Sequence, residues 1–211
     1  MSDAAGELIV ATSNPGKLRE IRELLAALPI RIQGLESVPG CVLPEEGDDY
    51  AANAIAKARS VALAAGRCAL AEDSGLEVAG LAGAPGARSA RFGGPGLDDA
   101  GRVRALLAAL AGASGSARAA RFVCVAALVT PQGDVTTARG ECRGRILAAA
   151  RGNAGFGYDP IFAAEDMPLS FAELPAAEKS RRSHRGIALR ALAPALRNAL
   201  CAQSPSAAMR S

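Results

Sequence analysis

The first 33 residues restrict the fold more than any other part of the chain, because their hydrophobic pattern changes twice. Leu8–Thr12 is a short β-rich run that ends in polar residues, which predicts a buried strand. Asn14 offers a side-chain oxygen as an N-cap, and Pro15 suits the first helical position, where no amide hydrogen is needed. Apolar residues then recur at helical spacing through residues 18–28, and residues 30–33 can form a second strand. This strand, turn, helix and strand are typical of an α/β protein.

The rest of the chain continues to alternate helical and extended patterns. Helices are predicted over residues 50–65, 98–110 and 183–200, with Pro194 as a position for a kink. Strands are predicted over 68–71, with 76–78 as a continuation, over 122–129 and 135–142 as a β-hairpin, and over 144–149. No internal repeat and no clean linker is visible. We therefore expect one domain over residues 1–211, with two lobes around a substrate cleft, and fraying of the small polar tail 202–211.

The composition excludes several classes of protein. A chain of 211 residues can bury a core without disulfides, and a formal charge of +3 is too small to indicate nucleic-acid binding by itself. The five cysteines are scattered, with no Cys-x-x-Cys pair, which favours buried thiols in a reducing compartment. The sequence shows no signal-peptide pattern, and no apolar run approaches the roughly 20 residues of a membrane span. We expect a cytoplasmic protein that does not contact a membrane.

Lysine is rare in this chain, where arginine outnumbers it by 21 to 3. A biased genome would replace lysine by arginine wherever either residue serves. The three remaining lysines, Lys17, Lys57 and Lys179, lie in or beside the polar and glycine-rich motifs described below. They therefore indicate positions where a compact ammonium group is needed.

The segment Thr12-Ser13-Asn14-Pro15-Gly16-Lys17 has the features of an anion site. A strand that runs into a polar turn and a helix start presents free backbone amides and the positive end of the helix dipole. Lys17 adds a mobile charge suited to phosphate. The segment is not a P-loop, because the Gly-x-x-x-x-Gly-Lys spacing is absent. A capped helix with a surface lysine explains the same pattern.

The segment Glu72-Asp73-Ser74-Gly75 is expected at the carboxyl end of the strand 68–71. Carboxylates in that position commonly face a cleft in α/β sheets. Together with Glu45 or Glu46 of the acidic loop 44–49, Asp73 is suited to hold Mg²⁺, which prefers oxygen ligands and keeps several waters. One such water can be activated for attack on phosphorus. A solvated turn is the alternative interpretation.

The segment Gly155-Phe156-Gly157-Tyr158-Asp159-Pro160 is notable because aromatic residues make up only 3% of the chain. Its glycines allow the backbone to approach a ligand closely, and an aromatic face can stack on a base. A loop that places its rings in the core is the alternative.

The segments Glu178-Lys179-Ser180 and Ser183-His184-Arg185-Gly186 contain the only histidine of the chain. Polar donors at this predicted helix start can recognise an oxo group on a purine ring. A structural histidine is the alternative.

Together these motifs resemble the inosine triphosphate pyrophosphatase family, also called the dITP/XTP pyrophosphatases. The matching segments follow the family's order over nearly the whole chain, and they are Ala11–Lys17, Asn53–Ala58, Glu72–Leu76, Gly83–Gly86, Ser89–Phe92, Gly155–Phe162, Glu178–Ser180 and Ser183–Gly186.

The resemblance implies an α/β fold with a long mixed central sheet flanked by helices. It also implies that a homodimer hydrolyses dITP, ITP and XTP to the monophosphate and pyrophosphate with Mg²⁺, which clears them from the nucleotide pool. In-line attack of a metal-bound water on the α-phosphorus fits this reaction. Selectivity would come from hydrogen bonds to the 6-oxo group, because adenine presents a donor at that position.

The resemblance further implies roles for single residues. Asp73 matches the catalytic carboxylate, which acts as base or metal ligand. Glu45 matches the metal ligand of the acidic loop, counted back from Lys57. The residues expected to bind the substrate are Thr12, Ser13, Asn14, Pro15, Gly16, Lys17, Lys57, Ser74, Phe156, Gly157, Tyr158, Asp159, Lys179, His184 and Arg185.

Some positions depart from the family's pattern. The usual Thr-Phe pair after the acidic loop is Asp49-Tyr50, and the usual Glu before Asn53 is Ala52. Glu46 therefore remains an alternative to Glu45 as the metal ligand. Glu72 stands where many relatives have Asp. The stretch 93–96 differs from the usual continuation at the expected edge of the cleft.

Two other classes of function are alternatives to an enzyme. A nucleotide sensor without turnover would share the binding motifs, but it would not need the metal carboxylates Asp73 and Glu45, which are both present. A nucleic-acid-binding protein would use the arginines, yet the chain lacks a continuous basic stripe with interleaved aromatic residues. We therefore expect no nucleic-acid partner.

Overall fold

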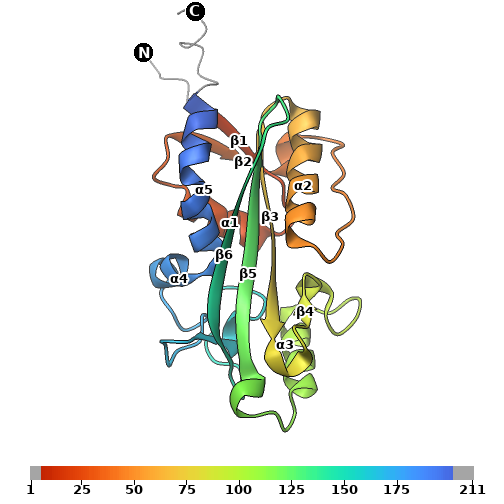
Figure 1. Ribbon diagram of the computed structural model, residues 1–211, viewed down its shortest axis with the longest axis vertical. Coiled ribbons are helices and arrows are strands. Elements are labelled where there is room, and N and C mark those ends of the chain that lie inside the picture. The colour runs from red at the N-terminus through yellow and green to blue at the C-terminus, as the bar shows by residue number, and fades with distance from the viewer. Residues whose placement is uncertain (1–5, 202–211) are drawn as a thin grey trace, which may run out of the picture. The chain divides into compact units, whose positions relative to one another are not determined.

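The computed structural model describes residues 6–201, with the side chain of residue 201 left aside (Figure 1). The tail 202–211, for which we expected fraying, lies outside the described residues. The chain divides into two compact units. Among the described residues, unit 1 comprises 6–73, 125–139 and 188–201, and unit 2 comprises 74–124 and 140–187.

The elements of the described chain form a mixed α/β fold. The helices are α1 (Pro15–Leu24), α2 (Tyr50–Ala65), α3 (Asp99–Ala109), α4 (Ala176–Arg182) and α5 (His184–Cys201). The strands are β1 (Gly6–Val10), β2 (Ile30–Gln33), β3 (Cys68–Val78), β4 (Pro85–Gly86), β5 (Ala119–Val129), β6 (Val135–Ile146) and β7 (Phe162–Ala164).

The strands form one sheet in the order β2-β1-β3-β5-β6-β7, with β4 paired to β3. β1 runs parallel to both β2 and β3, whereas β4 is antiparallel to β3 and β7 is antiparallel to β6. The predicted α/β class and mixed sheet are therefore confirmed. β3, β5 and β6 each contribute residues to both units.

In unit 1, α2 and α5 lie on opposite sides of the sheet strands (Figure 1). Successive residues of β1 face opposite sides, so Ile9 packs with Ala54 and Ala58 of the alanine-rich α2. Gly6 leaves room for α5, because a Cβ atom at this position would lie 2.8 Å from the Cβ of Leu200. Small side chains thus allow both helices to approach the sheet closely.

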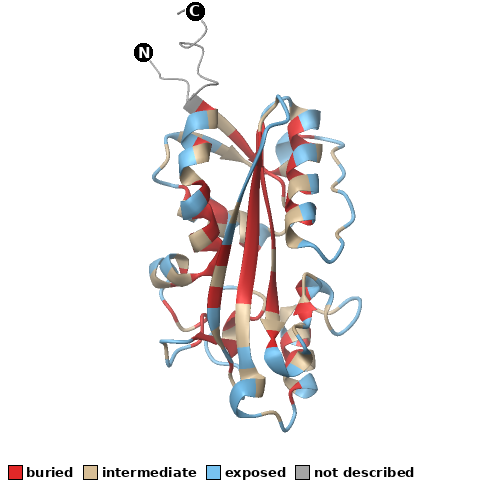
Figure 2. Cartoon of the chain, viewed as in Figure 1, coloured by how far each residue is buried: buried red, intermediate tan, exposed pale blue. Residues whose placement is uncertain are grey.

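Unit 2 has its own core around three phenylalanines. Phe122 of β5 contacts Phe162 edge to face at 4.6 Å, and Phe162 contacts Phe171 at 4.9 Å in the same manner. Leu76 of β3 and Leu106 of α3 belong to the same cluster and are fully buried. Figure 2 shows that β5 is buried over most of its length. This core includes the last residues of β3, Leu76 and Val78, and it includes Phe171 in the chain that follows β7.

Two predicted strand boundaries are wrong. Glu72-Asp73-Ser74-Gly75 does not follow a strand but lies inside β3, which continues from Cys68 to Val78. The segment 144–149 forms no separate strand, because β6 extends to Ile146. Polar residues and glycine inside a strand gave the wrong signal in both places. The short elements β7 and α4 were not predicted, because three and seven residues are too few to show a period.

Candidate active site

The turn before α1 is ordered by two side chains. Thr12 Oγ1 accepts a hydrogen bond from the amide of Asn14 at 3.2 Å, and Asn14 Oδ1 accepts one from the amide of Lys17 at 3.1 Å. Asn14 is thus the N-cap and Pro15 occupies the first turn, as predicted. The capped-helix interpretation and the anion-site interpretation both fit this geometry, so the position of Lys17 decides between them.

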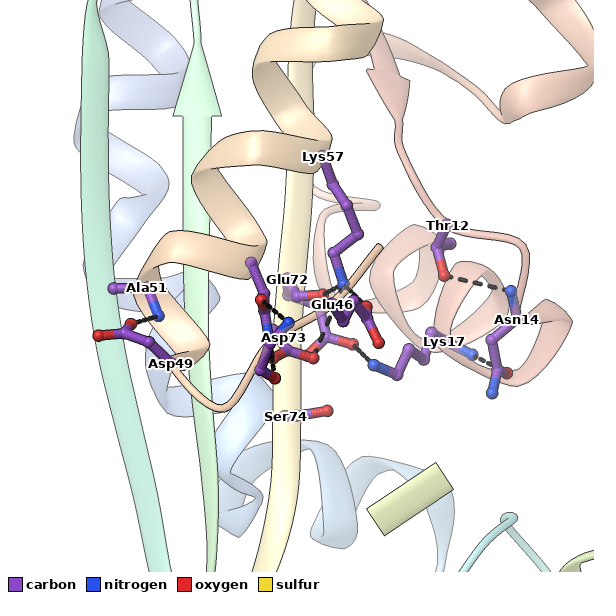
Figure 3. A network of polar contacts seen from close by, with 12 residues as sticks. Thr12, Asn14, Lys17, Glu46, Asp49, Ala51, Lys57, Glu72, Asp73 and Ser74 are labelled. Atoms are coloured by element: carbon purple, nitrogen blue, oxygen red, sulfur yellow. Dashed lines mark hydrogen bonds and ion pairs between the residues drawn. The ribbon is translucent and has the colours of Figure 1, made fainter. Parts of the chain in front are cut away.

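Lys17 does not point away into solvent. Its ammonium nitrogen lies 3.0 Å from Oε1 of Glu72, whose side chain is fully buried in β3 (Figure 3). Figure 3 also shows Lys57 of α2 reaching the same region of β3. Its Nζ donates to the carbonyl oxygen of Glu72 at 3.0 Å and lies 3.7 Å from Oδ1 of Asp73. The two helices therefore bring both lysines to the two carboxylates in the middle of β3.

Asn53 connects the acidic loop to Asp73. Its side-chain nitrogen donates to Oδ2 of Asp73 at 2.7 Å and to the carbonyl oxygen of Gly47 at 3.0 Å. Its side-chain oxygen accepts from the amide of Gly47 at 2.8 Å. Glu46, next to Gly47, forms an ion pair with Lys57. We call Lys17, Glu46, Asn53, Lys57, Glu72 and Asp73 the catalytic cluster.

Sequence reasoning named only part of the catalytic cluster. Asp73, Lys17 and Lys57 were predicted site residues, and Glu46 was the alternative to Glu45. Glu72 and Asn53 belong to the motifs that the sequence singles out, but they were not among the predicted site residues, although Asn53 lies four residues before Lys57 on the same face of a helix. The structure does not place Glu45 in the cluster, because its side chain is exposed on the loop before α2.

Asp73 has an unusual environment for a carboxylate. Burial raises its pKa above the ordinary value of 3.8, while Lys57, the hydrogen bond from Asn53 and Lys17 act in the opposite direction. Glu46 raises the pKa further through repulsion. A buried carboxylate with a raised pKa is a candidate base.

Unit 2 holds the second group of predicted residues. Phe156 lies in the loop 155–158, where Lys179 Nζ is 5.2 Å and the guanidinium carbon of Arg185 is 5.5 Å from the centre of its ring. Arg185 also donates to Ser74 Oγ at 3.3 Å. We call Ser74, Phe156, Asp159, Lys179, His184 and Arg185 the aromatic cluster. Both cations lie close enough to the ring for cation–π interactions, and the same arrangement suits the binding of a flat, polar ligand.

Asp159 and Lys179 form a buried ion pair within the aromatic cluster. Lys179 Nζ lies 2.5 Å from Oδ2 of Asp159, and both residues are less than 10% exposed. The same oxygen accepts the amide of Phe156 at 2.8 Å. Asp159 therefore holds both Lys179 and the loop beside it.

Two predicted substrate-binding side chains are buried and contact residues of the core. Tyr158 is buried and its hydroxyl donates to the carbonyl oxygen of Ser89 at 2.8 Å, and burial raises its pKa to about 12. The His184 ring is buried and stacks on Phe122 with a centroid distance of 4.6 Å. For Tyr158, the alternative of a ring placed in the core is confirmed. His184 directly precedes Arg185 in the first turn of α5.

Residues 8–195 match the family model of the Ham1 family. The chain belongs to the Ham1 family. Curated relatives share much of its sequence. The dITP/XTP pyrophosphatase of Desulforamulus reducens is 44% identical over 87% of this chain and 92% of the relative. The dITP/XTP pyrophosphatase of Thermus thermophilus is 45% identical over 91% of this chain and 92% of the relative.

Solved structures of this family have the same fold. A HAM1 protein from Coxiella burnetii is 41% identical, with a TM-score of 0.80 over 92% of this chain and 99% of that chain. The nucleoside-triphosphatase, or dITP/XTP pyrophosphatase, from Mycobacterium abscessus is 40% identical with a TM-score of 0.71, and the match covers 90% of this chain and 98% of that chain. The resemblance that the motifs indicated is confirmed.

One departure from the family's pattern has a simple physical explanation. Asp49, in the place of the usual Thr, is the N-cap of α2, where its carboxylate accepts the amides of Ala51 at 2.7 Å and Ala52 at 2.9 Å. Asp and Thr are both favourable N-cap residues. This chain therefore keeps the start of the helix that carries Asn53 and Lys57.

Proposed function

We propose that this chain hydrolyses the purine nucleoside triphosphates dITP, ITP and XTP to the monophosphate and pyrophosphate. Membership of the Ham1 family and the names of the relatives support this activity. The observation that carries the proposal is the catalytic cluster. In it, the buried Asp73 of β3 lies between Asn53 and Lys57 of α2. A carboxylate held in this manner can act on a water molecule, which a nucleotide sensor would not require.

The chain supplies a base and two positive charges to the reaction. Asp73 can accept the proton of the attacking water, because its carboxylate has a raised pKa and is fixed by Asn53. Lys17 and Lys57 can move from their carboxylate partners to the phosphates and neutralise the charge that develops on the leaving pyrophosphate. Attack at the α-phosphorus would release pyrophosphate in one step.

The activity is tested by pyrophosphate release from a panel of triphosphates. We expect release from ITP, dITP and XTP with magnesium, and little release from ATP and GTP. Orthophosphate as the product, or equal rates with ATP and ITP, would reject the proposal. The nucleic-acid alternative is tested with a labelled DNA duplex, which we expect to remain unbound at moderate salt.

We also propose that the catalytic cluster binds Mg²⁺. Its three carboxylates and two ammonium groups leave one excess negative charge, so a triphosphate needs a cation to enter it. Among the side chains of residues 6–200, no group of three or more His, Cys, Asp or Glu is placed to hold a metal by itself. Mg²⁺ is suited to such a site, because one or two carboxylates, waters and substrate phosphates can complete its coordination. When bound, the ion would neutralise phosphate charge and activate a water.

Two matched variants, Glu45→Gln and Glu46→Gln, test which glutamate of the acidic loop binds the metal. Glu46 is paired with Lys57, whereas Glu45 is exposed and can turn toward the metal. We expect Glu45→Gln to raise the magnesium concentration for half-maximal activity by about tenfold or more. Glu46→Gln should change this concentration less, and it should instead change the pH profile through Lys57 and Asp73. The reverse order would assign the metal to Glu46.

The raised pKa of Asp73 predicts loss of activity in acid. The base works only when ionised, so kcat/KM should fall as the pH decreases through its pKa, above the ordinary value of 3.8. Lys57 lowers this pKa, and Lys57→Met should therefore move the acid limb to higher pH, whereas Lys57→Arg should leave it nearly in place. Profiles at fixed magnesium, each scaled to its own plateau, measure the shift. An unchanged limb in Lys57→Met would contradict the assignment of the base.

We further propose that the protein is a cytoplasmic homodimer. No helix in the described part of the chain is long and apolar enough to cross a membrane. The four described cysteines are free thiols, as suits a reducing compartment.

Light scattering after size exclusion should give twice the chain mass of 21.3 kDa, and a monomer at micromolar concentration would reject the dimer.

A further inference from the structure

The loop 155–158 of unit 2 lies outside any helix or strand. Its shape therefore depends on what its backbone groups contact. The carbonyl oxygens of Phe156 and Tyr158 accept the amides of Asp159 at 3.3 Å and Ile161 at 3.0 Å in the turn that follows. Two successive amides of the loop have carboxylate acceptors. The amide of Phe156 donates to Asp159 at 2.8 Å, and that of Gly157 donates to Oδ2 of Asp99 at 2.7 Å.

Asp99 comes from a distant part of the sequence, the first turn of α3. Its other oxygen forms an ion pair with Arg102. Arg102 in turn donates to the carbonyl oxygens of Leu97 and Ala90, which lie before the helix. Asp99 is thereby fixed on both sides, so a rigid helix start holds the amide of Gly157.

The neighbouring residue Asp98 has a different task. It is the N-cap of α3, and its Oδ1 accepts the amide of Gly101 at 2.7 Å. The two adjacent aspartates therefore have different roles at one helix end. Asp98 caps the helix, while Asp99 reaches out of it to the loop. The pair offers a matched control, because both residues carry the same charge near the same helix dipole.

We propose that Asp99 is a positioning residue for substrate recognition, which acts by fixing the backbone at Gly157 and hence the ring of Phe156. The inference rests on the proposed function and on the expectation from the sequence that Phe156 binds the base. The ring lies beside Lys179 and Arg185, so a change in the direction of the loop would separate the aromatic face from its two cations. In this proposal Asp99 acts through the loop backbone rather than through its own contact with the substrate.

The test compares Asp99→Ala, Asp99→Asn and Asp98→Ala with the wild type in pyrophosphate release from ITP. Loss of a charge-assisted hydrogen bond should raise KM for ITP by about tenfold or more in Asp99→Ala, with kcat changed by less than about threefold. Asp99→Asn keeps an acceptor oxygen and should recover part of this loss. Asp98→Ala should reduce thermal stability but leave KM unchanged.

Two further measurements separate the possible failures. Inhibition by inorganic triphosphate, which lacks a base, should be equal in wild type and Asp99→Ala. Hydrogen exchange of a peptide that covers residues 153–162 should become faster in Asp99→Ala but not in Asp98→Ala. Faster exchange with an unchanged KM would overturn the positioning role, and so would unchanged exchange. No turnover of ITP by the wild type would reject the proposed function, while the exchange experiment would still report on the contact.

Discussion

Asp73→Asn should lower kcat for ITP hydrolysis by about 10²–10⁴-fold without unfolding the protein. The substitution keeps the size of the side chain, and its carbonyl oxygen can still accept the hydrogen bond from Asn53. It removes the negative charge that accepts a proton and that would contact the metal. Because burial penalises this charge, the variant should be at least as stable as the wild type.

The measurement needs a matched control. Asp134→Asn makes the same change in the turn between β5 and β6, where the side chain is exposed and accepts a hydrogen bond from Thr130 Oγ1 at 3.2 Å. We expect its kcat and melting temperature to equal those of the wild type. If Asp73→Asn kept more than a tenth of the activity, Asp73 would not be the base, and Glu72 would be examined in its place.

Local sequence signals predicted the elements whose ends carry capping residues. Asn14 with Pro15 marked the start of α1. The helix predicted over residues 50–65 ends before Gly66, whose positive φ of 61° suits glycine. By contrast, β3 was cut short, because Glu72 and Asp73 are polar residues in a strand. Their charges are stabilised there by Lys17 of α1 and Lys57 of α2 and, for Asp73, by the hydrogen bond from Asn53.

The candidate site followed the same rule. Residues in compact motifs were found from the sequence, including Asp73, Lys17 and Phe156. Residues that act across a long separation were not. Asp99 is 58 residues from Gly157, and its position after a helix cap has the same pattern as any acidic first turn. The periodicity of the sequence does not indicate which loop amide such a carboxylate will bind, because only the folded chain brings the two groups together.

Lys179→Met should cost about 3–5 kcal/mol of unfolding free energy, the largest stability loss we expect from one substitution. Lys179 and Asp159 are both buried, with 2.5 Å between Nζ and Oδ2. Removal of the lysine leaves the carboxylate of Asp159 buried and uncompensated. For a protein of this size the melting temperature should fall by roughly 10 °C.

A double-mutant cycle separates the charge from the packing. Asp159→Asn removes the uncompensated charge, and its carbonyl oxygen can still accept the amide of Phe156. The double variant Lys179→Met with Asp159→Asn should therefore be more stable than Lys179→Met alone, which gives a coupling energy of at least about 1–2 kcal/mol. Arg181→Met on the same helix is the control, because its pair with Glu178 is exposed and should contribute less than about 1 kcal/mol. Additive losses in the cycle would mean that the buried pair contributes through packing alone. The retention of lysine at position 179 in an arginine-rich chain would then need a reason other than this ion pair.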